Sequence, residues 1–153
     1  MSVIRKAIDL KKILQLNKIK RNKIGLVPTM GSLHKGHLSL INEATENCDV
    51  VWVSIFVNPV QFNDPKDFKL YPTDQNSDIK KIHSISKDIN LFIPESVREI
   101  YPVDTISEKF DFGIIDKVME GAHRPGHFNG VATVLKKLFE IFEPNHVFLV
   151  RKT

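Results

Sequence analysis

Apolar residues recur along the chain at two spacings, one typical of helices and one of buried strands. The helical spacing near the N-terminus predicts a first helix over about residues 4–20, on the apolar positions Ala7, Leu10 and Leu14. An apolar run that starts at Ile24 predicts a short strand, which we expect Pro28 to end.

The pattern then changes to a helix and back to a strand. A second helix is predicted from positions that keep a helical period after a turn with glycines, namely Leu38, Ile41, Thr45 and Cys48. The stretch Val50–Val57 reads VVWVSIFV, which is typical of a strand buried on both faces. With the strand at Ile24, these elements form one β-α-β unit.

The second half of the chain continues this alternation. After a proline-containing loop, Thr73 is expected to cap a helix with inward positions at Ile79, Ile82 and Ile85. Residues 90–94 predict a strand, whereas residues 95–118 show no clear pattern. A last helix, followed by a strand over residues 146–149, is predicted from Phe128, Val131, Leu135, Leu138 and Phe142.

Strands that alternate with helices predict an α/β fold, in which a parallel sheet is covered by helices on both faces and joined by right-handed crossovers. A chain of 153 residues has room for one domain, and no repeat or internal linker divides it. We therefore expect ligands to bind beyond the carboxyl ends of the strands.

Composition and charge narrow the class of protein. The chain is 42% hydrophobic and 26% charged, as in folded globular domains, so disorder and coiled coils are disfavoured. The net charge is +4, and eight basic residues precede Ile24 against the single acidic Asp9. Because these basic residues are scattered around the first helix without aromatic residues, they indicate a solvated face, and we expect no nucleic-acid partner.

Cysteine content and hydropathy bear on the compartment. Cys48 is the only cysteine, which excludes an internal disulfide and fits a reducing cytoplasm. The longest apolar run, Val50–Val57, is too short to span a bilayer, and the N-terminal residues lack the apolar core of a signal peptide. We expect a cytoplasmic protein without a membrane partner.

The stretch PTMGSLHKGHLSLI, residues 28–41, places His34 and His37 beside Gly31 and Gly36. It contains neither a P-loop motif nor a G-x-G-x-x-G fingerprint. A metal site is disfavoured because no third ligand accompanies the histidines at a standard spacing. Two interpretations stay open: two exposed turn histidines, or phosphate binding by free N–H groups of a helix N-terminus together with imidazole donors.

Two further motifs are expected at the same edge of the sheet. The segment NPVQF follows the long buried strand, and RPGHF precedes the last predicted helix. Because loops carry function while the strands below them fix their positions, this convergence weighs more than any single residue.

These residues carry a family resemblance. His34-x-Gly36-His37 after a first strand resembles the H-x-G-H signature of the nucleotidyltransferases related to class I aminoacyl-tRNA synthetases, which have a Rossmann-like fold. The longer segments PTMGSLHKGHLSLI, VSIFVNPVQF and EGAHRPGHFNGVATVLKKLF resemble the pantothenate synthetase (pantoate-β-alanine ligase) family, and the likeness runs over residues 22–148.

The resemblance implies an activity that forms pantothenate, a coenzyme A precursor, in two steps. Pantoate attacks the α-phosphorus of MgATP and releases pyrophosphate, and the β-alanine amine then displaces AMP from pantoyl adenylate. ATP and Mg²⁺ are thus the implied cofactors, pantoate and β-alanine the substrates, and a homodimer the implied assembly.

The resemblance also assigns residues. His37 and His34 are the implied catalytic residues, with His37 as proton donor in adenylation. The implied ATP-binding residues are Met30, Gly31, Ser32, Leu33, His34, Lys35, Gly36 and His37. The implied pantoate-binding residues are Pro28, Met30, Asn58 and Gln61. The side of the site that takes β-alanine and phosphate has Gln61, Arg124 and His127, and no metal ligand is assigned to a protein side chain.

The match breaks at the end of the chain. Family members continue with phenylalanine or tyrosine and then Gly-Glu-Lys-Asp-x-Gln-Gln, whereas this chain ends in Leu149-Val150-Arg151-Lys152-Thr153. We expect residues 1–153 to be the N-terminal nucleotide-binding domain without the family's C-terminal lid domain, and the chain alone to be inactive or weakly active. A one-nucleotide shift of codons for Phe-Gly-Glu-Lys-Asp spells these five residues, so a frameshift is hypothesised, in which Lys152 is not the family's ATP-contacting lysine.

Two alternatives remain to the interpretation that the chain is an N-terminal piece of a pantothenate synthetase. One is a nucleotidyltransferase of another substrate class, and the other is a non-catalytic module for nucleotide binding or dimerisation.

Overall fold

The computed structural model describes residues 3–58, 74–101 and 127–150. In chain order the elements are β1 (Val3–Ile4), α1 (Ala7–Ile19), β2 (Ile24–Thr29), α2 (Lys35–Asn47), β3 (Val50–Ile55), α4 (Gln75–Ile85), β4 (Asn90–Phe92), the 3-10 turn η2 (Val97–Glu99), α6 (His127–Phe142) and β5 (His146–Val147). None of the helices described is long and apolar enough to cross a membrane.

The strands form one parallel sheet in the order β1-β4-β3-β2-β5. The central pair β2 and β3 is in register over its whole length, from Ile24 opposite Val50 to Thr29 opposite Ile55. The carboxyl ends of β2 and β3 therefore lie together at one edge. The predicted α/β architecture is confirmed.

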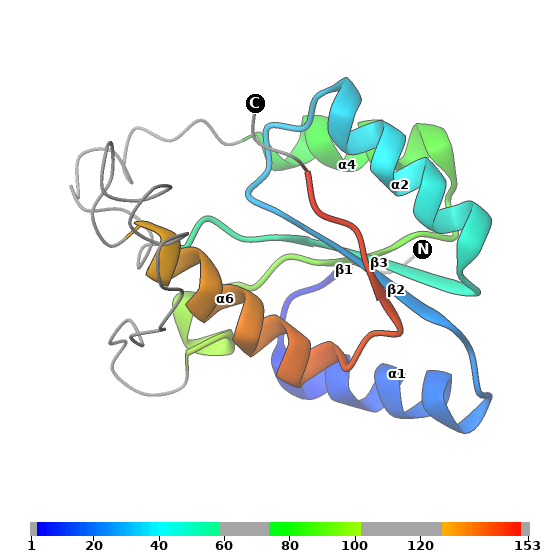
Figure 1. Cartoon of the computed structure of the whole chain (residues 1–153), viewed down its shortest axis with the longest axis horizontal. Coiled ribbons are helices and arrows are strands. Elements are labelled where there is room, and N and C mark those ends of the chain that lie inside the picture. Colours follow the sequence, from blue (N-terminus) through cyan, green and yellow to red (C-terminus); the bar gives the residue numbers. More distant parts are fainter. Residues whose placement is uncertain (1–2, 59–73, 102–126, 151–153) are drawn as a thin grey trace, which may run out of the picture.

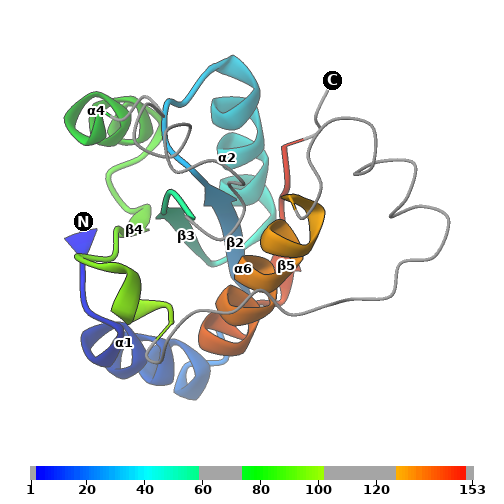
Figure 2. The same ribbon diagram turned by 90° about the vertical axis from the view of Figure 1, so that its left-hand side faces the viewer.

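Helices cover both faces of the sheet. Figure 1 shows α2 and α4 on one face and α1 and α6 on the other, and Figure 2 shows the same two layers end-on. Alternate residues of β3 enter different cores: Trp52 packs on the α1 and α6 side, and Val51 and Val53 on the α2 and α4 side. This two-sided burial confirms the prediction for β3, since a strand with both faces covered has no polar face.

The N-terminal prediction is wrong in one respect. The first helix begins at Ala7, because Val3 and Ile4 instead form an edge strand that pairs with Leu91 and Phe92 of β4. Two residues carry too little pattern to separate a short strand from the start of a helix.

Pro28 does not end β2, which continues to Thr29. The carbonyl of Leu26 accepts from Phe148 N on the β5 side, and a parallel strand directs every second residue to the same neighbour. Pro28 therefore faces the β5 side, beyond the last β2–β5 pair at Leu26. Proline is tolerated there because its missing N–H has no ladder bond to lose.

The cap of α4 also differs from the prediction. Asp74 is the N-cap, and its Oδ1 accepts from the backbone N–H of Ser77 at 3.1 Å. Thr73, the predicted cap, lies outside the described residues. A carboxylate one residue later satisfies the free N–H of the first turn in the usual way.

Candidate nucleotide site

The turn between β2 and α2 has a left-handed backbone at two successive residues. Gly31 has φ +86° and Ser32 has φ +51°. A side chain at residue 31 would be strained by this backbone, and its Cβ would lie 3.1 Å from Asp78 Oδ2 and 3.3 Å from Ile55 Cγ2. Glycine is therefore required here, while Ser32 holds a conformation that most residues avoid.

Side chains from β2 and α4 hold this turn. Thr29 Oγ1 accepts from Gly31 N at 3.2 Å and donates to the carbonyl of Ser54 on β3 at 2.9 Å. The carboxylate of Asp78 on α4 accepts from Ser32 N through Oδ2 and from Leu33 N through Oδ1, both at 2.9 Å.

A second contact from α4 completes this arrangement. Lys81 lies one helical turn beyond Asp78, and its Nζ donates to the carbonyl of Leu33 at 2.9 Å. The side chain of Asp78 is buried, and both of its carboxylate oxygens accept hydrogen bonds, as a buried polar group requires. The turn is thus fixed to α4 as well as to the sheet.

The two histidines cap the N-terminus of α2 reciprocally. His34 is the N-cap residue, and its Nδ1 accepts from Gly36 N at 3.0 Å. His37 Nδ1 accepts from His34 N at 3.1 Å, and the two ring centroids are 4.0 Å apart. A Cβ at Gly36 would lie 2.8 Å from His34 Cε1, so glycine provides the space for this cap.

These bonds determine which imidazole atoms can donate. Because each Nδ1 accepts a hydrogen bond, each neutral ring carries its proton on Nε2. Burial, with a smaller contribution from His34, lowers the pKa of His37 below its usual 6.5, while the charge of Asp78 partly opposes this. His37 is therefore a neutral Nε2–H donor at pH 7.

The sequence predicted free backbone N–H groups at this helix start, and the structure differs at four of them. The N–H groups of Ser32 and Leu33 bind Asp78, and those of His34 and Gly36 bind imidazoles. Side chains thus occupy these four backbone donors, and the imidazole Nε2–H groups are two further donors at the start of the helix. That residues 30–37 bind ATP stays a prediction.

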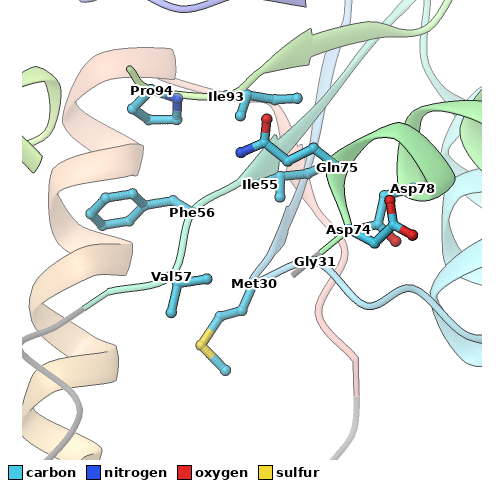
Figure 3. A pocket seen from close by; sticks show the side chains of 10 residues that line it. All are labelled: Met30, Gly31, Ile55, Phe56, Val57, Asp74, Gln75, Asp78, Ile93 and Pro94. Atoms are coloured by element: carbon cyan, nitrogen blue, oxygen red, sulfur yellow. The ribbon is translucent and has the colours of Figure 1, made fainter. Parts of the chain in front are cut away.

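A pocket of about 160 Å³ opens beside this turn, at the carboxyl ends of β2, β3 and β4. Its lining residues are Met30, Gly31, Ile55, Phe56, Val57, Asp74, Gln75, Asp78, Ile93 and Pro94. Figure 3 shows the two carboxylates together on α4, with Phe56 and Val57 on the opposite side. The pocket lies where parallel sheets usually bind ligands.

The structure places the other predicted residues as follows. Met30 and Gly31 line the pocket, whereas Pro28 and Asn58 do not. Asn58 is fully buried, and its Oδ1 accepts from the hydroxyl of Tyr101 at 3.1 Å. Burial raises the pKa of Tyr101 far above its usual value, partly offset by this bond, so Tyr101 stays a neutral donor.

Three predicted residues cannot be placed by their side chains. Gln61 and Arg124 lie outside the described residues, and only the backbone of His127, the first residue of α6, is described. In the part of the chain that is described, no group of three or more histidine, cysteine, aspartate or glutamate residues could hold a metal ion.

Sequence reasoning missed Asp78 and Lys81. A signal for Asp78 was present, because it lies four residues before Ile82 and thus on the inward face of the predicted helix. A charged residue on a buried face needs a partner, which would have marked Asp78 for attention.

Comparison with known proteins identifies the family. The family model for pantoate-beta-alanine ligase matches residues 2–153. Pantothenate synthetase of Flavobacterium psychrophilum is 47% identical over 152 residues, covering 99% of this chain and 54% of the relative. The same enzyme of Cytophaga hutchinsonii is 50% identical over 135 residues, covering 88% of this chain and 47% of the relative.

Solved structures agree with these relatives. Pantoate-beta-alanine ligase from Francisella tularensis, in complex with beta-gamma ATP and beta-alanine, has a TM-score of 0.85 and 41% identity, covering 95% of this chain and 56% of that one. Pantothenate synthetase from Thermus thermophilus has a TM-score of 0.84 and 37% identity, covering 96% of this chain and 51% of that one. The chain spans about half the length of the relatives it matches. It belongs to the pantoate-beta-alanine ligase family.

Proposed function

We propose that this protein takes part in the ATP-dependent condensation of pantoate with β-alanine to pantothenate, and that the described residues form the nucleotide-binding part of the active site. Family membership supports the reaction, and the Francisella ligase with a bound ATP compound and β-alanine supports these ligands. The observation that carries the proposal is the pair of imidazoles whose Nδ1 atoms cap α2 and whose Nε2–H groups remain as donors.

The two donors suit phosphoryl chemistry. When the carboxylate of pantoate attacks the α-phosphorus, negative charge grows on the phosphate oxygens, and preorganised donors stabilise that charge. Because their Nδ1 bonds hold both rings in place, His34 and His37 need little reorganisation to donate. In this proposal His37 serves as the proton donor in adenylation.

A magnesium ion would accompany the triphosphate. Mg²⁺ in such sites neutralises phosphate charge and is held largely by phosphate oxygens and water, with one or two carboxylates at most.

Substrate binding extends the proposal to further residues. Pro28, Met30, Asn58 and Gln61 are proposed to bind pantoate, and Arg124 and His127 to act with Gln61 on the β-alanine and phosphate side. Met30 lines the pocket at the strand ends, and the hydroxyl of Tyr101 fixes the orientation of the Asn58 amide. A cytoplasmic homodimer is proposed as the assembly.

Imidazole nitrogen NMR of the 153-residue chain, titrated with MgATP, tests the nucleotide site. We expect the Nε2 signals of His34 and His37 to shift, while His83 on α4 and His146 on β5 serve as internal references. Unchanged His34 and His37 signals at millimolar MgATP would contradict the proposal.

Two further assays address the alternatives. Pantoate-dependent exchange of pyrophosphate into ATP reports adenylation directly, and binding of ATP without exchange would favour a non-catalytic module. A stronger response to CTP than to ATP would favour another class of nucleotidyltransferase.

A further inference from the structure

Asp78 has a buried carboxylate to which the proposed function assigns no role. Its exposed fraction is 2%, and both of its oxygens accept backbone N–H groups from a turn 45 and 46 residues earlier in the chain. A buried charge with two specific long-range partners is not explained by helix α4, whose own cap is Asp74.

The partners of Asp78 belong to the strained part of the site. Ser32 has φ +51° and directly follows Gly31 at φ +86°. A left-handed conformation at a residue other than glycine persists only where surrounding contacts impose it. The bonds from Ser32 N and Leu33 N to Asp78 are such contacts, and the bond from Lys81 Nζ to the Leu33 carbonyl adds a third from the same helix.

The position of the turn determines the position of the imidazoles. Leu33 immediately precedes His34, whose own N–H is bound by His37. A change in the direction of the Leu33 backbone would therefore move both members of the histidine cap. The same carboxylate also withholds the Ser32 and Leu33 N–H groups from any anion.

We propose that Asp78 is the positioning residue of the histidine site: from α4 it holds the Gly31–Leu33 turn, and through that turn it sets the placement of His34 and His37. Lys81 supports the same turn from the carbonyl side. The effect on nucleotide binding rests on the proposed function, whereas the effect on the free protein does not.

Asp78→Asn is the main test, because asparagine keeps the shape but has one acceptor oxygen in place of two and no charge. We expect amide hydrogen exchange at Ser32 and Leu33 to accelerate about tenfold or more, as expected for the loss of a charge-assisted hydrogen bond. We also expect the pKa of His37, measured by NMR, to fall further, because the carboxylate now favours the charged imidazole. This fall reports the loss of the nearby charge, whereas amide exchange at Ser32 and Leu33 reports how firmly the turn is held.

Two control variants separate position from stability and from charge. Ile82→Val removes a methyl group from the buried face of α4 without touching either Asp78 bond, so it reports general destabilisation of this helix. Asp88→Asn removes one negative charge from an exposed residue after α4. We expect neither control to change exchange at Ser32 and Leu33 selectively, or to change the pKa of His37.

Lys81→Met provides a second route if Asp78→Asn does not fold. Lys81 is exposed, and its substitution removes only the bond to the Leu33 carbonyl. We expect faster exchange in the turn by about threefold, consistent with one hydrogen bond at a partly exposed site.

The outcomes distinguish the two proposals. Unchanged amide exchange in the turn of Asp78→Asn would overturn the positioning role, even if MgATP binds and the pKa of His37 falls. If the wild-type chain fails to bind MgATP but amide exchange in the variant accelerates, the positioning role stands and the proposed function fails. Where MgATP does bind, we expect about tenfold weaker binding in Asp78→Asn than in Ile82→Val.

Discussion

The N-termini of α2 and α4 differ in the side chains that bind their free backbone N–H groups. At α4 one carboxylate, that of Asp74, accepts from Ser77 N in an ordinary cap. At α2 two imidazoles bind two N–H groups reciprocally, and a buried carboxylate from another helix binds the two N–H groups before them. A single aspartate would cap α2 as well, so capping alone does not account for two imidazoles, to which the proposed function assigns a chemical role.

The largest effect is expected when one imidazole of the α2 cap is removed. In a catalytically complete version of this protein, we expect His37→Ala to lower pantoate-dependent pyrophosphate exchange by about two orders of magnitude or more, because a preorganised donor to the transition state is lost. His37→Asn is the matched variant, since its Oδ1 takes the place of Nδ1 and keeps the bond from His34 N. The same loss of exchange in both variants, with stability kept only in His37→Asn, would assign the activity to Nε2–H. Exchange within twofold of wild type in either variant would contradict that role.

The second change concerns the strained turn that precedes α2. We expect Gly31→Ala to lower the free energy of unfolding by about 2 kcal/mol, because φ is +86° and the new Cβ lies 3.1 Å from Asp78 Oδ2. Urea unfolding monitored by circular dichroism measures this. An unchanged unfolding midpoint would show that the turn relaxes without strain.

How far the sequence predicted this arrangement depends on the length of each pattern. The strands β2 and β3 and the helices α2, α4 and α6 were predictable because their apolar residues repeat over many positions. The two-residue strand β1 was not, and neither was the length of β2, because the tolerance of Pro28 depends on where β5 ends. The histidines were found by motif, but their bonding was not.

For Asp78 the sequence could predict burial but not the hydrogen-bond partners. Its place on the inward face of α4 follows from the spacing to Ile82, so a buried charge was foreseeable. Its partners were not, because a contact across 45 residues depends on how α4 packs beside the β2–α2 turn. The spacing of apolar residues predicts which face of a helix or strand is buried. It does not predict which other element packs against that face.

The third prediction compares how much the Asp74 cap of α4 and the His34 cap of α2 contribute to the free energy of unfolding. Asp74→Ala should lower the free energy of unfolding by about 1 kcal/mol, the usual loss for an N-cap, measured by urea unfolding. His34→Asn should change it by less than about 0.5 kcal/mol, because the Oδ1 of asparagine can accept from Gly36 N in place of Nδ1. Equal losses in both variants would mean that the imidazole contributes more than a cap to the stability of α2.

The fourth prediction concerns the pH dependence of stability that His37 contributes. Burial lowers the pKa of His37 in the folded state, so the unfolded chain binds more protons below pH 6.5. Stability from this residue is therefore fully present above pH 6.5 and is lost as the pH falls through the lowered value of the folded state. Urea unfolding at several pH values should show a smaller loss in His37→Asn than in wild type. The same pH dependence in both proteins would contradict this assignment.

The smallest expected effect on stability is that of Gly36→Ala, where two terms oppose each other. Alanine in the first turn of α2 favours the helix by up to about 1 kcal/mol relative to glycine. The new Cβ, however, lies 2.8 Å from His34 Cε1, so the imidazole must leave its cap, which costs about 1 kcal/mol. We expect the unfolding free energy to stay nearly unchanged while the imidazole NMR signals of His34 shift and MgATP binding weakens.

Gly25→Ala is the contrasting control, because its Cβ would meet Cys48 Sγ at 2.8 Å in the packed layer between β2 and α2 and should destabilise the fold. If Gly36→Ala keeps the His34 signals of the wild type, the glycine is not what admits the histidine cap, and the difference between the two helix starts must lie in the turn before it.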